Sequence, residues 1–412
     1  MGATSKTRDV LSTVPSLRAR NESLVMSNRW LVLTLLFLIR TAMAFQFGTV
    51  GALGPIVGQT FQVDAAGVGL LVGLYLAPGL IFALPGGAIG RYLGDKRAVL
   101  TGLTLMTLGG LISAFGTTWE EQLVGRVLAG GGGVVLNVLM SKMVTDWFDG
   151  REIATAMALF VNSWPAGIGI ALLVQPHAAN SGGVTGAFAL TAVFAAIGFA
   201  SLLLLYRQPK VTTGPAGGLL YGKTLACILL AGGMWGLFNA SFAMIFAFGP
   251  ILLTGRGWEI ASASSATSIA VWLSALSVPI GGIVADWSKR PNLVIVIGLV
   301  FTAVAMASLP RASSMLSALV VAGLISGLPV GAIMALPARV LAPPNRALGM
   351  GLFFTVFYVF VFLGPPIAGA LIDKTGWDGA AMDFGAFMLI IAAILLWVFE
   401  RLAVSVESDK QS

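Results

Sequence analysis

Two arginines stand where a charge is unexpected, inside long apolar stretches of the sequence. Arg40 lies in RWLVLTLLFLIRTAMAFQFG, and Arg126 lies in EEQLVGRVLAGGGG. A guanidinium stays charged at neutral pH, and its planar fork donates parallel hydrogen bonds to a carboxylate or another oxyanion. The two residues therefore indicate recognition of an anion, and we expect a binding role rather than catalysis.

Further polar or aromatic side chains fall near the middles of the apolar runs, where they would share a site with the arginines. Trp235 and Asn239 are four residues apart, on one face of a helix. Ordinary core packing explains any single one of these residues equally well. The candidate substrate-binding residues are Arg40, Gln46, Tyr75, Arg126, Asn137, Asn162, Trp164, Trp235, Asn239, Trp272 and Tyr358.

The composition places these residues in a membrane protein. Of 412 residues, 57% are apolar and 10% are charged, and the mean hydropathy is +0.92. Soluble domains carry about 25% charged residues, and a soluble fold cannot hide so much apolar surface. The single Cys227 excludes an intramolecular disulfide, and the single His177 excludes a histidine-rich metal site. We expect neither a metal nor a cofactor.

Twelve apolar runs of about 20 residues are each long enough to cross the bilayer core as a helix. They do not alternate in the way that membrane-spanning strands require. The sequence therefore predicts an all-α membrane protein with twelve transmembrane helices. The runs cover residues 30–54, 66–91, 97–116, 121–146, 151–175, 183–206, 223–250, 260–286, 291–309, 313–339, 346–372 and 380–400.

The distribution of Lys and Arg predicts the orientation. With both termini in the cytoplasm, nineteen of the 24 basic residues fall on the cytoplasmic side. The outer loops then hold Arg256, Arg311 and Lys374. Such an excess marks the cytoplasmic side, so the net charge of +7 reflects topology rather than nucleic-acid binding. We expect a multi-pass protein of the plasma or inner membrane.

An internal repeat divides the chain into two halves. LGPI at 53–56 aligns with FGPI at 248–251, and PGGAIGRY at 85–92 aligns with IGGIVADW at 280–287. REIATAMALF at 151–160 aligns with RALGMGLFF at 346–354. The offset is 195 residues each time (249 − 54, 282 − 87 and 346 − 151). A duplicated six-helix unit is typical of transporters, whose substrate site lies near the midplane between the halves.

At these segments the chain resembles the major facilitator superfamily. GGIVADWSKR at 281–290 and, less closely, GGAIGRYLGDKR at 86–97 are similar to its Gly-x-x-x-Asp-Arg/Lys signature. In the second segment Arg91 takes the place of the acid, and Asp95 follows later. RVLAGGGG at 126–133 matches the family's Arg-x-x-x-Gly-x-Gly pattern in the fourth span, and GPPIAG at 364–369 lies in the eleventh.

The resemblance implies two six-helix bundles working by alternating access. Within the superfamily, the chain is loosely similar to porters of small anions of the cyanate, nitroimidazole and nitrate/nitrite types. Trp164 and Pro165 stand where the nitrate porters carry a glycine-rich signature, so nitrate itself is disfavoured. The expected segments are a tail at 1–28, bundles at 29–206 and 223–402, a linker at 207–222 and a second tail at 403–412.

Charged residues in the cytoplasmic motifs predict a latch between the halves. A carboxylate there can accept bonds from free helix N–H groups and can pair with arginine. We expect Asp286 to face Arg151 at the start of the fifth span, and Asp95 to play the matching part near Arg346. Solvated charges without a latch are the alternative. The candidate gating residues are Arg91, Asp95, Arg97, Arg151, Asp286, Arg290 and Arg346.

The stretch GGLLYGKT, residues 217–224, fits the phosphate-binding pattern GxxxxGK[ST]. That chemistry needs a strand before the loop and a helix after it. Here a polar linker, RQPKVTTGPA, precedes the pattern, and the seventh apolar run follows it. We interpret the stretch as a cytoplasmic loop with Lys223 as a basic anchor, and we expect no nucleotide.

The depth of Arg40 in the membrane bears on whether it binds a substrate. It lies ten residues after Trp30, about 15 Å along a helix and near mid-membrane. No Asp or Glu lies deep in any predicted span; the nearest are Glu120, Glu121 and Asp383. Either the arginines bond to carbonyls and amides and brace the bundle, or they await an anionic substrate. The substrate interpretation is favoured for Arg40, and the two are balanced for Arg126.

The sequence thus predicts a secondary transporter of a small organic or inorganic anion. Efflux of neutral, drug-like compounds by the same fold is the first alternative, and the lack of buried acids counts against cations. A membrane sensor on a transporter scaffold is the second alternative, although the longest tail has only about 28 residues. We expect a monomer whose partners are its substrate and the membrane lipids.

Overall fold

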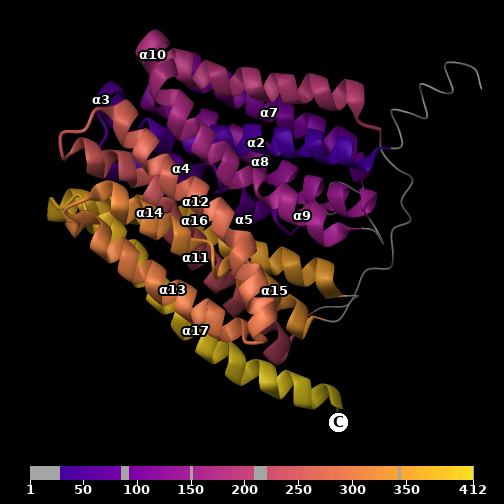
Figure 1. The fold of residues 1–412 in the computed structure, drawn as a ribbon. Coiled ribbons are helices and arrows are strands. Elements are labelled where there is room, and N and C mark those ends of the chain that lie inside the picture. Colours follow the sequence, from indigo (N-terminus) through magenta and orange to yellow (C-terminus); the bar gives the residue numbers. More distant parts are fainter. Residues whose placement is uncertain (1–27, 85–91, 149–151, 208–219, 342–344, 412) are drawn as a thin grey trace, which may run out of the picture.

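The structure, a computed structural model, describes residues 28–84, 92–148, 152–207, 220–341 and 345–411, and every regular element within these ranges is a helix. Figure 1 shows a bundle of long helices, in which α13 and α17 run obliquely to α2 and α7. In the described ranges, eleven helical segments are long and apolar enough to cross a membrane. The prediction of an all-α, multi-pass membrane protein is therefore confirmed.

The first half of the chain forms α2 (Arg29–Ala52), α3 (Gly54–Phe61), α4 (Ala65–Leu74), α5 (Gly79–Phe82), α7 (Asp95–Phe115), α8 (Trp119–Trp147), α9 (Ile153–Val161) and α10 (Ser163–Leu205). The second half forms α11 (Gly222–Thr254), α12 (Ile260–Ser288), α13 (Pro291–Ser308), η1 (Leu309–Arg311), α14 (Met315–Ser326), α15 (Val330–Val340), α16 (Arg346–Thr375) and α17 (Ala380–Gln411). The short helix α3 was not predicted.

Two of the twelve predicted spans are joined in one element, α10. The segment has 43 residues, which is about 65 Å of continuous helix and far more than a bilayer core needs. Its regular backbone is interrupted at Gly183, where φ is +63° and ψ is −163°, a conformation that only glycine adopts readily. A Cβ placed on Gly186 would lie 3.3 Å from the carbonyl oxygen of Ala178, so the chain reverses here. The first arm of α10 thus belongs to the fifth span, together with α9, and the second arm is the sixth span (Figure 1).

Three spans are broken in mid-course, and the breaks matter for the site. The second span stops after α4 and resumes at α5, beyond Pro78, because the residue before a proline disfavours helix. The fifth span is interrupted between α9 and α10 at Asn162, three residues before Pro165. The tenth is interrupted between α14 and α15, before Pro329. Each break leaves backbone carbonyls without their usual helical partners.

The two halves of the chain lie side by side, the first in indigo to magenta and the second in orange to yellow (Figure 1). α4 packs on α16, α10 on α12 and α2 on α11, so these pairs join the halves. Gly69 and Gly73 allow the close approach, since a Cβ there would lie 2.3 Å and 2.1 Å from the carbonyl oxygens of Pro365 and Phe362. Small residues serve this purpose throughout membrane bundles.

The ends of the bundle can be told apart by their contacts. We call the end with the starts of α2 and α11 the terminal end, and the opposite one the distal end. At the terminal end, Arg29 donates to Glu152 at 2.6 Å, and the Lys96 ammonium donates to the carbonyls of Leu203 and Tyr206. These bonds stay within the first half.

At the distal end, hydrogen bonds connect the halves. The Asp373 carboxylate, at the end of α16, accepts from the backbone N–H groups of Ala65 and Ala66 at 3.0 and 2.8 Å. These groups are unpaired donors of the first turn of α4, where the helix dipole also favours a negative charge. The Ser264 hydroxyl on α12 donates to the carbonyl of Ala52 at 3.1 Å. The distal end is therefore closed by direct bonds.

We predict that Asp373→Ala opens the distal end more often. Loss of a helix cap costs about 0.5–2 kcal/mol, so the open population should rise by about twofold to thirtyfold. In a Cys227→Ala background, a cysteine replacing the buried Ala247, which packs on Gly51, reports the opening. Maleimide labelling of purified protein in detergent should be faster. Lys374→Ala, the neighbouring exposed residue, is the control, and equal labelling of the two variants would show that Asp373 does not hold this end.

Candidate functional site

Arg40 projects from the middle of α2 and is 9% exposed. Its Nε and Nη2 donate to the Asn137 side-chain oxygen on α8, both at 3.2 Å. Its Nη1 donates to the carbonyls of Phe160 and Val161, at 3.2 and 3.0 Å, and to the Ser163 hydroxyl at 3.2 Å. The two carbonyls belong to the last turn of α9, so the break at Asn162 supplies half of the site.

The acceptors around Arg40 are all neutral. Its guanidinium carbon lies 4.9 Å from the ring centre of Phe160 and 5.6 Å from that of Trp164, within the range of a cation–π contact. Among the described residues, no carboxylate forms an ion pair with it. The guanidinium N–H groups thus have hydrogen-bond acceptors, but no carboxylate in the part of the chain that the structure describes neutralises the charge.

Arg126 is bound more completely and is 2% exposed. Its three nitrogens donate to the carbonyls of Leu71, Gln46 and Phe47 at 2.9, 2.8 and 3.2 Å. Its guanidinium also lies 4.7 Å from the ring centre of Tyr75. The Leu71 carbonyl lies in the last turn of α4, where the chain leaves the helix. This arrangement favours the bracing interpretation for Arg126.

Gln46 and Tyr75 belong to the same braced cluster. The Gln46 amide donates to the carbonyl of Met106 at 3.0 Å, and the Tyr75 hydroxyl donates to Met43 and Gln46 at 3.3 Å each. Gln46 is 2% exposed and Tyr75 is fully buried. Both side chains therefore fill the interior of the first half, and they stay predictions as substrate ligands.

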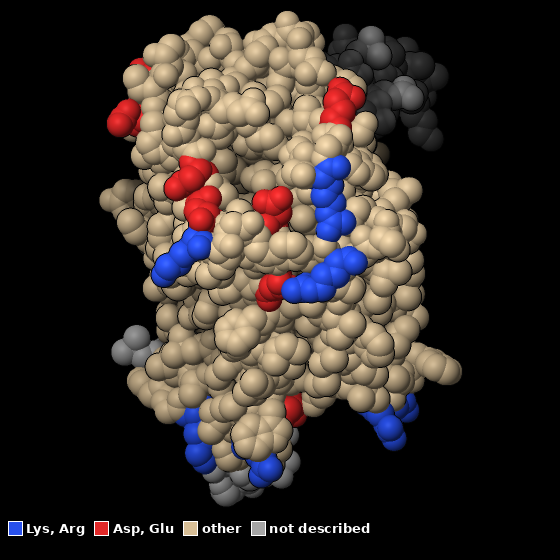
Figure 2. Space-filling model, turned by 90° about the vertical axis from the view of Figure 1, so that its left-hand side faces the viewer, with Lys and Arg blue, Asp and Glu red and all other residues tan. Residues whose placement is uncertain are grey.

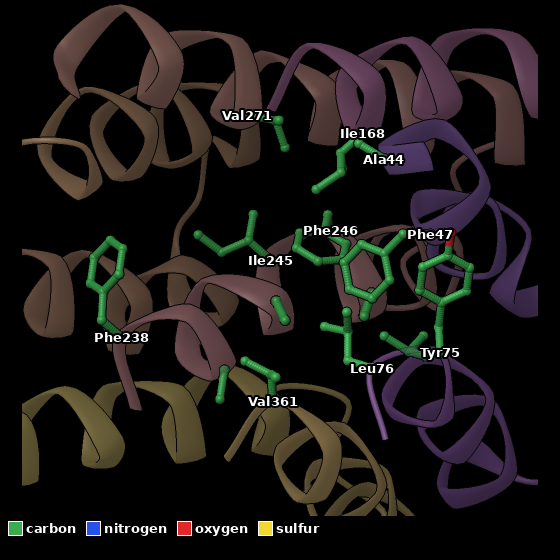
Figure 3. Packing of buried hydrophobic residues seen from close by; sticks show 14 of the residues in the cluster. Ala44, Phe47, Tyr75, Leu76, Ile168, Phe238, Ile245, Phe246, Val271 and Val361 are labelled. Carbon is green, nitrogen blue, oxygen red and sulfur yellow. The ribbon is translucent and has the colours of Figure 1, made fainter. Parts of the chain in front are cut away.

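An apolar layer separates the Arg40 site from the distal end. Phe47 of α2 meets Phe246 of α11 across the interface between the halves, with ring centres 5.6 Å apart. Figure 3 shows Phe47 between Phe246 and Tyr75, with Leu76 and Val361 on one side and Ile168 on the other. We call this group, with Phe47 and Phe246 at its centre, the distal seal. The Gly51 position supports it, since a Cβ there would lie 2.5 Å from the Phe246 carbonyl oxygen.

The second half reaches Arg40 through Tyr358 on α16. The Asn137 amide donates to its hydroxyl at 3.4 Å, and the Tyr358 ring packs on Gly79, where a Cβ would be only 2.3 Å away. Phe357 contacts Tyr358 edge-on, with ring centres 4.9 Å apart, and stacks on Trp235 at 6.3 Å. Four predicted residues, Arg40, Asn137, Tyr358 and Trp235, are thus joined through one another and Phe357.

The remaining candidate residues lie near this group. Trp164 stacks on Phe47 with ring centres 5.1 Å apart, and Asn162 is half-buried at the break between α9 and α10. Trp272 on α12 lies against Gly169, where a Cβ would be 2.7 Å from its ring. The amide of Asn239 donates back to the carbonyl of Trp235 at 2.8 Å.

One candidate latch residue, Asp95, has a partner that the sequence did not predict, and its role near Arg346 when the terminal end closes stays a prediction. Asp95 is 3% exposed and accepts from Lys142 of α8 at 2.7 Å, and Lys142 also pairs with Asp146. Asp95 is thus paired within its own half rather than with Arg346. A carboxylate buried beside α8 is best neutralised by the nearest ammonium, and the repeat could not reveal that Lys142 occupies this position.

The other latch residues are exposed or lie outside the described residues. Asp286, Arg290, Arg97 and Arg346 are exposed at the terminal end. Arg91 and Arg151 lie outside the described residues, so the proposed contact of Asp286 with Arg151 stays a prediction.

Sequence reasoning also missed Ser163, Phe160 and Phe47 around Arg40. Their types are common in apolar spans, and the two phenylalanines gave no signal. The proline at 165, which accompanies the break at Asn162, was the one available clue.

Comparison of the chain with known proteins agrees with this architecture. The sequence matches the profile of the Major Facilitator Superfamily over residues 36–259 and again over residues 224–411. The chain belongs to this superfamily. The two overlapping matches cover both halves, as expected from the internal repeat, and the prediction from the motifs is confirmed.

Solved superfamily structures show the same fold at low sequence identity. A bacterial homologue of the human lysosomal transporter Spinster, inward-facing and unoccupied, gives a TM-score of 0.72 at 17% identity over 92% of this chain and 98% of that chain. A mutant of the nucleoside transporter NupG gives 0.71 at 16% identity over 91% of this chain and 100% of that chain.

Curated relatives match shorter stretches. A probable chloroplastic anion transporter 3 of Oryza sativa subsp. japonica is 26% identical over 34% of this chain and 27% of that protein. A transporter of Buchnera aphidicola subsp. Schizaphis graminum is 23% identical over 35% of this chain and 36% of that protein. The chain thus matches about a third of the length of these relatives.

We predict that Arg126→Lys destabilises the superfamily fold. A single ammonium cannot reach the three carbonyls on α2 and α4 together, and a hydrogen bond to a charged group contributes about 1.5–3 kcal/mol. The melting temperature in detergent should fall by several degrees. Arg97→Lys, at an exposed position, is the matched control. If both variants melted with the native protein, Arg126 would not brace the bundle.

Proposed function

We propose that this protein is a secondary transporter that moves a small anion across the membrane by alternating access, with Arg40 as its anion-binding group. The observation that carries the proposal is a nearly buried guanidinium, at mid-span, whose acceptors are all neutral. A charge at the bilayer centre costs about 2.5–3.5 kcal/mol on insertion scales, and an incoming anion removes that penalty. Membership of a transporter superfamily supplies the framework.

The geometry suits an exchange of acceptors. Nε and Nη2 of Arg40 share one acceptor atom, the oxygen of Asn137. That oxygen accepts both bonds, whereas a carboxylate would offer one oxygen to each nitrogen in a bidentate pair. Asn137 is half-buried and can turn aside, while the carbonyls of Phe160 and Val161 hold Nη1 in place. An anion therefore displaces one weak acceptor and gains a full charge interaction.

Two gates follow from the same structure. The distal seal and the Asp373 bonds close one side of Arg40. We propose that the exposed charges Asp286, Arg290, Arg97 and Arg346 form the opposing latch when the terminal end closes, together with Arg91 and Arg151. With both termini in the cytoplasm, the distal end faces outward.

The charge of the distal face favours departure of an anion on that side. Seven acidic residues and three basic residues stand at the distal ends of the helices, so the balance is 3 − 7 = −4. They are Asp64, Glu120, Glu121, Glu259, Asp373, Asp378 and Asp383 against Arg256, Arg311 and Lys374. Figure 2 shows acidic and basic side chains scattered over a mostly uncharged face. A negative field repels anions, which slows their capture and speeds their release, so we propose export.

Efflux of neutral, drug-like compounds is the second candidate. One observation favours it: Arg40 already has neutral partners for each of its three nitrogens, which is what a bracing residue needs. In that case the site would select its cargo through apolar contacts alone, and Arg40 would matter for stability only.

Replacing Arg40 separates these candidates. We expect Arg40→Gln to fold, because the glutamine amide lies near the position of Nε and can still donate to Asn137. The change should weaken binding of carboxylates by at least about tenfold, since bonds to charged groups contribute about 1.5–3 kcal/mol. The stabilisation of the native fold by benzoate and acetate, measured as a thermal shift, should disappear. Neutral ligands should be unaffected. Unchanged carboxylate binding in a folded Arg40→Gln protein would leave the neutral-compound function.

We also predict that transport responds to the membrane potential. For a carried monovalent anion, the potential contributes about 2.3 kcal/mol per 100 mV, so an interior-negative potential drives outward flux. In proteoliposomes of defined orientation, efflux should accelerate as the negative potential is imposed with potassium and valinomycin. Flux that is indifferent to the potential would exclude electrogenic anion export and indicate exchange or co-transport of a proton.

A further inference from the structure

The exposed positions of α11 point to a space inside the protein. From residue 231 to residue 250 every residue of this helix is buried except Trp235, Asn239 and Phe242. These three are spaced by four and three residues, so they share one face. α11 is surrounded by α2, α12, α16 and α17, which pack directly against it. Because four helices pack around α11, we attribute the partial exposure of this face to an interior space rather than to contact with lipid.

Contacts from this face lead to the distal seal in one direction. The ring of Phe242 meets that of Phe246 edge-on, with centres 6.1 Å apart, and Phe246 meets Phe47 at 5.6 Å. Phe47 stacks on Trp164, which lies 5.6 Å from the guanidinium of Arg40. This path runs from the second half into the first along aromatic rings.

Contacts in the other direction reach the same arginine. Trp235 stacks on Phe357, Phe357 meets Tyr358, and the Tyr358 hydroxyl accepts from Asn137, which accepts from Arg40. The two paths therefore close into a ring of side chains, drawn from α2, α8, α10, α11 and α16. We call it the central ring. It shares Phe47 and Phe246 with the distal seal, and its other members lie on the terminal side of these two residues.

The central ring combines one charged side chain with a mostly aromatic remainder. Arg40 is its single charged member, and most of the others are aromatic. Arg126, the other arginine within the spans, is fully bonded behind Tyr75 and does not enter the ring. A dianion would place its second charge among phenylalanines and tryptophans, where desolvation is unfavourable. A small inorganic anion would bind Arg40 without using the aromatic surface that makes up the rest of the central ring.

We propose that the cargo is an aromatic monocarboxylate, with its carboxylate on Arg40 and its flat ring against Trp235 and Phe357. This inference rests on the proposed anion transport and specifies its substrate class. Offset and edge-on contacts between aromatic rings favour an aromatic substrate over an aliphatic substrate of similar surface area. The side-chain oxygen of Asn239, beside Trp235, offers an acceptor for a hydroxyl or amino group on the substrate ring.

The test uses the full-length protein in detergent and four defined probes. Benzoate is the matched ligand, acetate lacks the ring, benzamide lacks the charge, and terephthalate carries a second carboxylate. Calorimetric titration should give the tightest binding for benzoate, with acetate, benzamide and terephthalate each weaker by about tenfold or more, the scale of one lost ionic or stacking contact.

Substitutions in the central ring test whether benzoate binds there. Trp235→Ala should weaken benzoate by about tenfold, a loss expected when a stacking partner is removed, and should leave acetate unchanged. Trp235→Phe keeps a ring and should bind benzoate nearly as the native protein does, which guards against a folding defect. Trp397→Ala, which removes a tryptophan that is 60% exposed on α17, is the matched control.

The outcomes separate the two proposals. If acetate bound as tightly as benzoate and both depended on Arg40, the aromatic substrate class would be wrong and anion transport would stand. Equal binding of terephthalate and benzoate would likewise overturn the monocarboxylate assignment. If benzamide bound as tightly as benzoate and Arg40→Gln changed neither, anion transport itself would fail. If benzoate bound to Trp235→Ala as tightly as to the native protein, the central ring would not be the benzoate-binding site.

Discussion

The structure depends on how a guanidinium is accommodated inside a bundle of apolar helices. Helices in a membrane satisfy their own backbone groups, so an intact span has few acceptors to offer a cation. This protein provides acceptors by breaking two spans near their middles. The break between α4 and α5 exposes the carbonyl of Leu71 to Arg126, whose other two acceptors lie in the unbroken helix α2. The break at Asn162 exposes the carbonyls of Phe160 and Val161 to Arg40. Irregular backbone at depth and buried charge therefore explain each other.

The two arginines have different surroundings in the structure, although each lies in an apolar run of the sequence. Arg126 has three backbone carbonyls around its three nitrogens, and such acceptors cannot move without unfolding a helix end. Arg40 relies on Asn137 for two of its nitrogens, and a side-chain amide can rotate away. The first arrangement gives rigidity. The second leaves a charge that is held in place and can still change partners, which is what a reversible binding group requires.

The halves are held together by contacts that are individually weak. Close packing through Gly69, Gly73 and Gly51, the two bonds to Asp373 and the pair Phe47–Phe246 close the distal side without a buried ion pair. Separating them exposes aromatic surface and two N–H groups that water can satisfy. An interface of this kind can open and close repeatedly, whereas a buried salt bridge would strongly favour one state.

The amino-acid sequence by itself determined the large-scale architecture. Apolar runs, the uneven distribution of Lys and Arg among the connecting loops, and the 195-residue offset are read along the chain, because a membrane constrains each helix separately. The same reasoning found Arg40 and Arg126, since a charge in lipid is conspicuous wherever it points. It also placed Trp235 and Tyr358 among the candidates, without indicating which helix face each would occupy.

Tertiary structure decided what these residues contact. The reversal at Gly183, the short helix α3 and the pairing of Asp95 with Lys142 depend on neighbours far away in the sequence. So do the bracing of Arg126 and the ring that joins Arg40 to Trp235. Hydrophobicity fixes which segments enter the membrane, but it is nearly equal on all sides of these helices. Which face meets which helix is set by side-chain shape and hydrogen-bonding geometry, and these are expressed only when the helices pack.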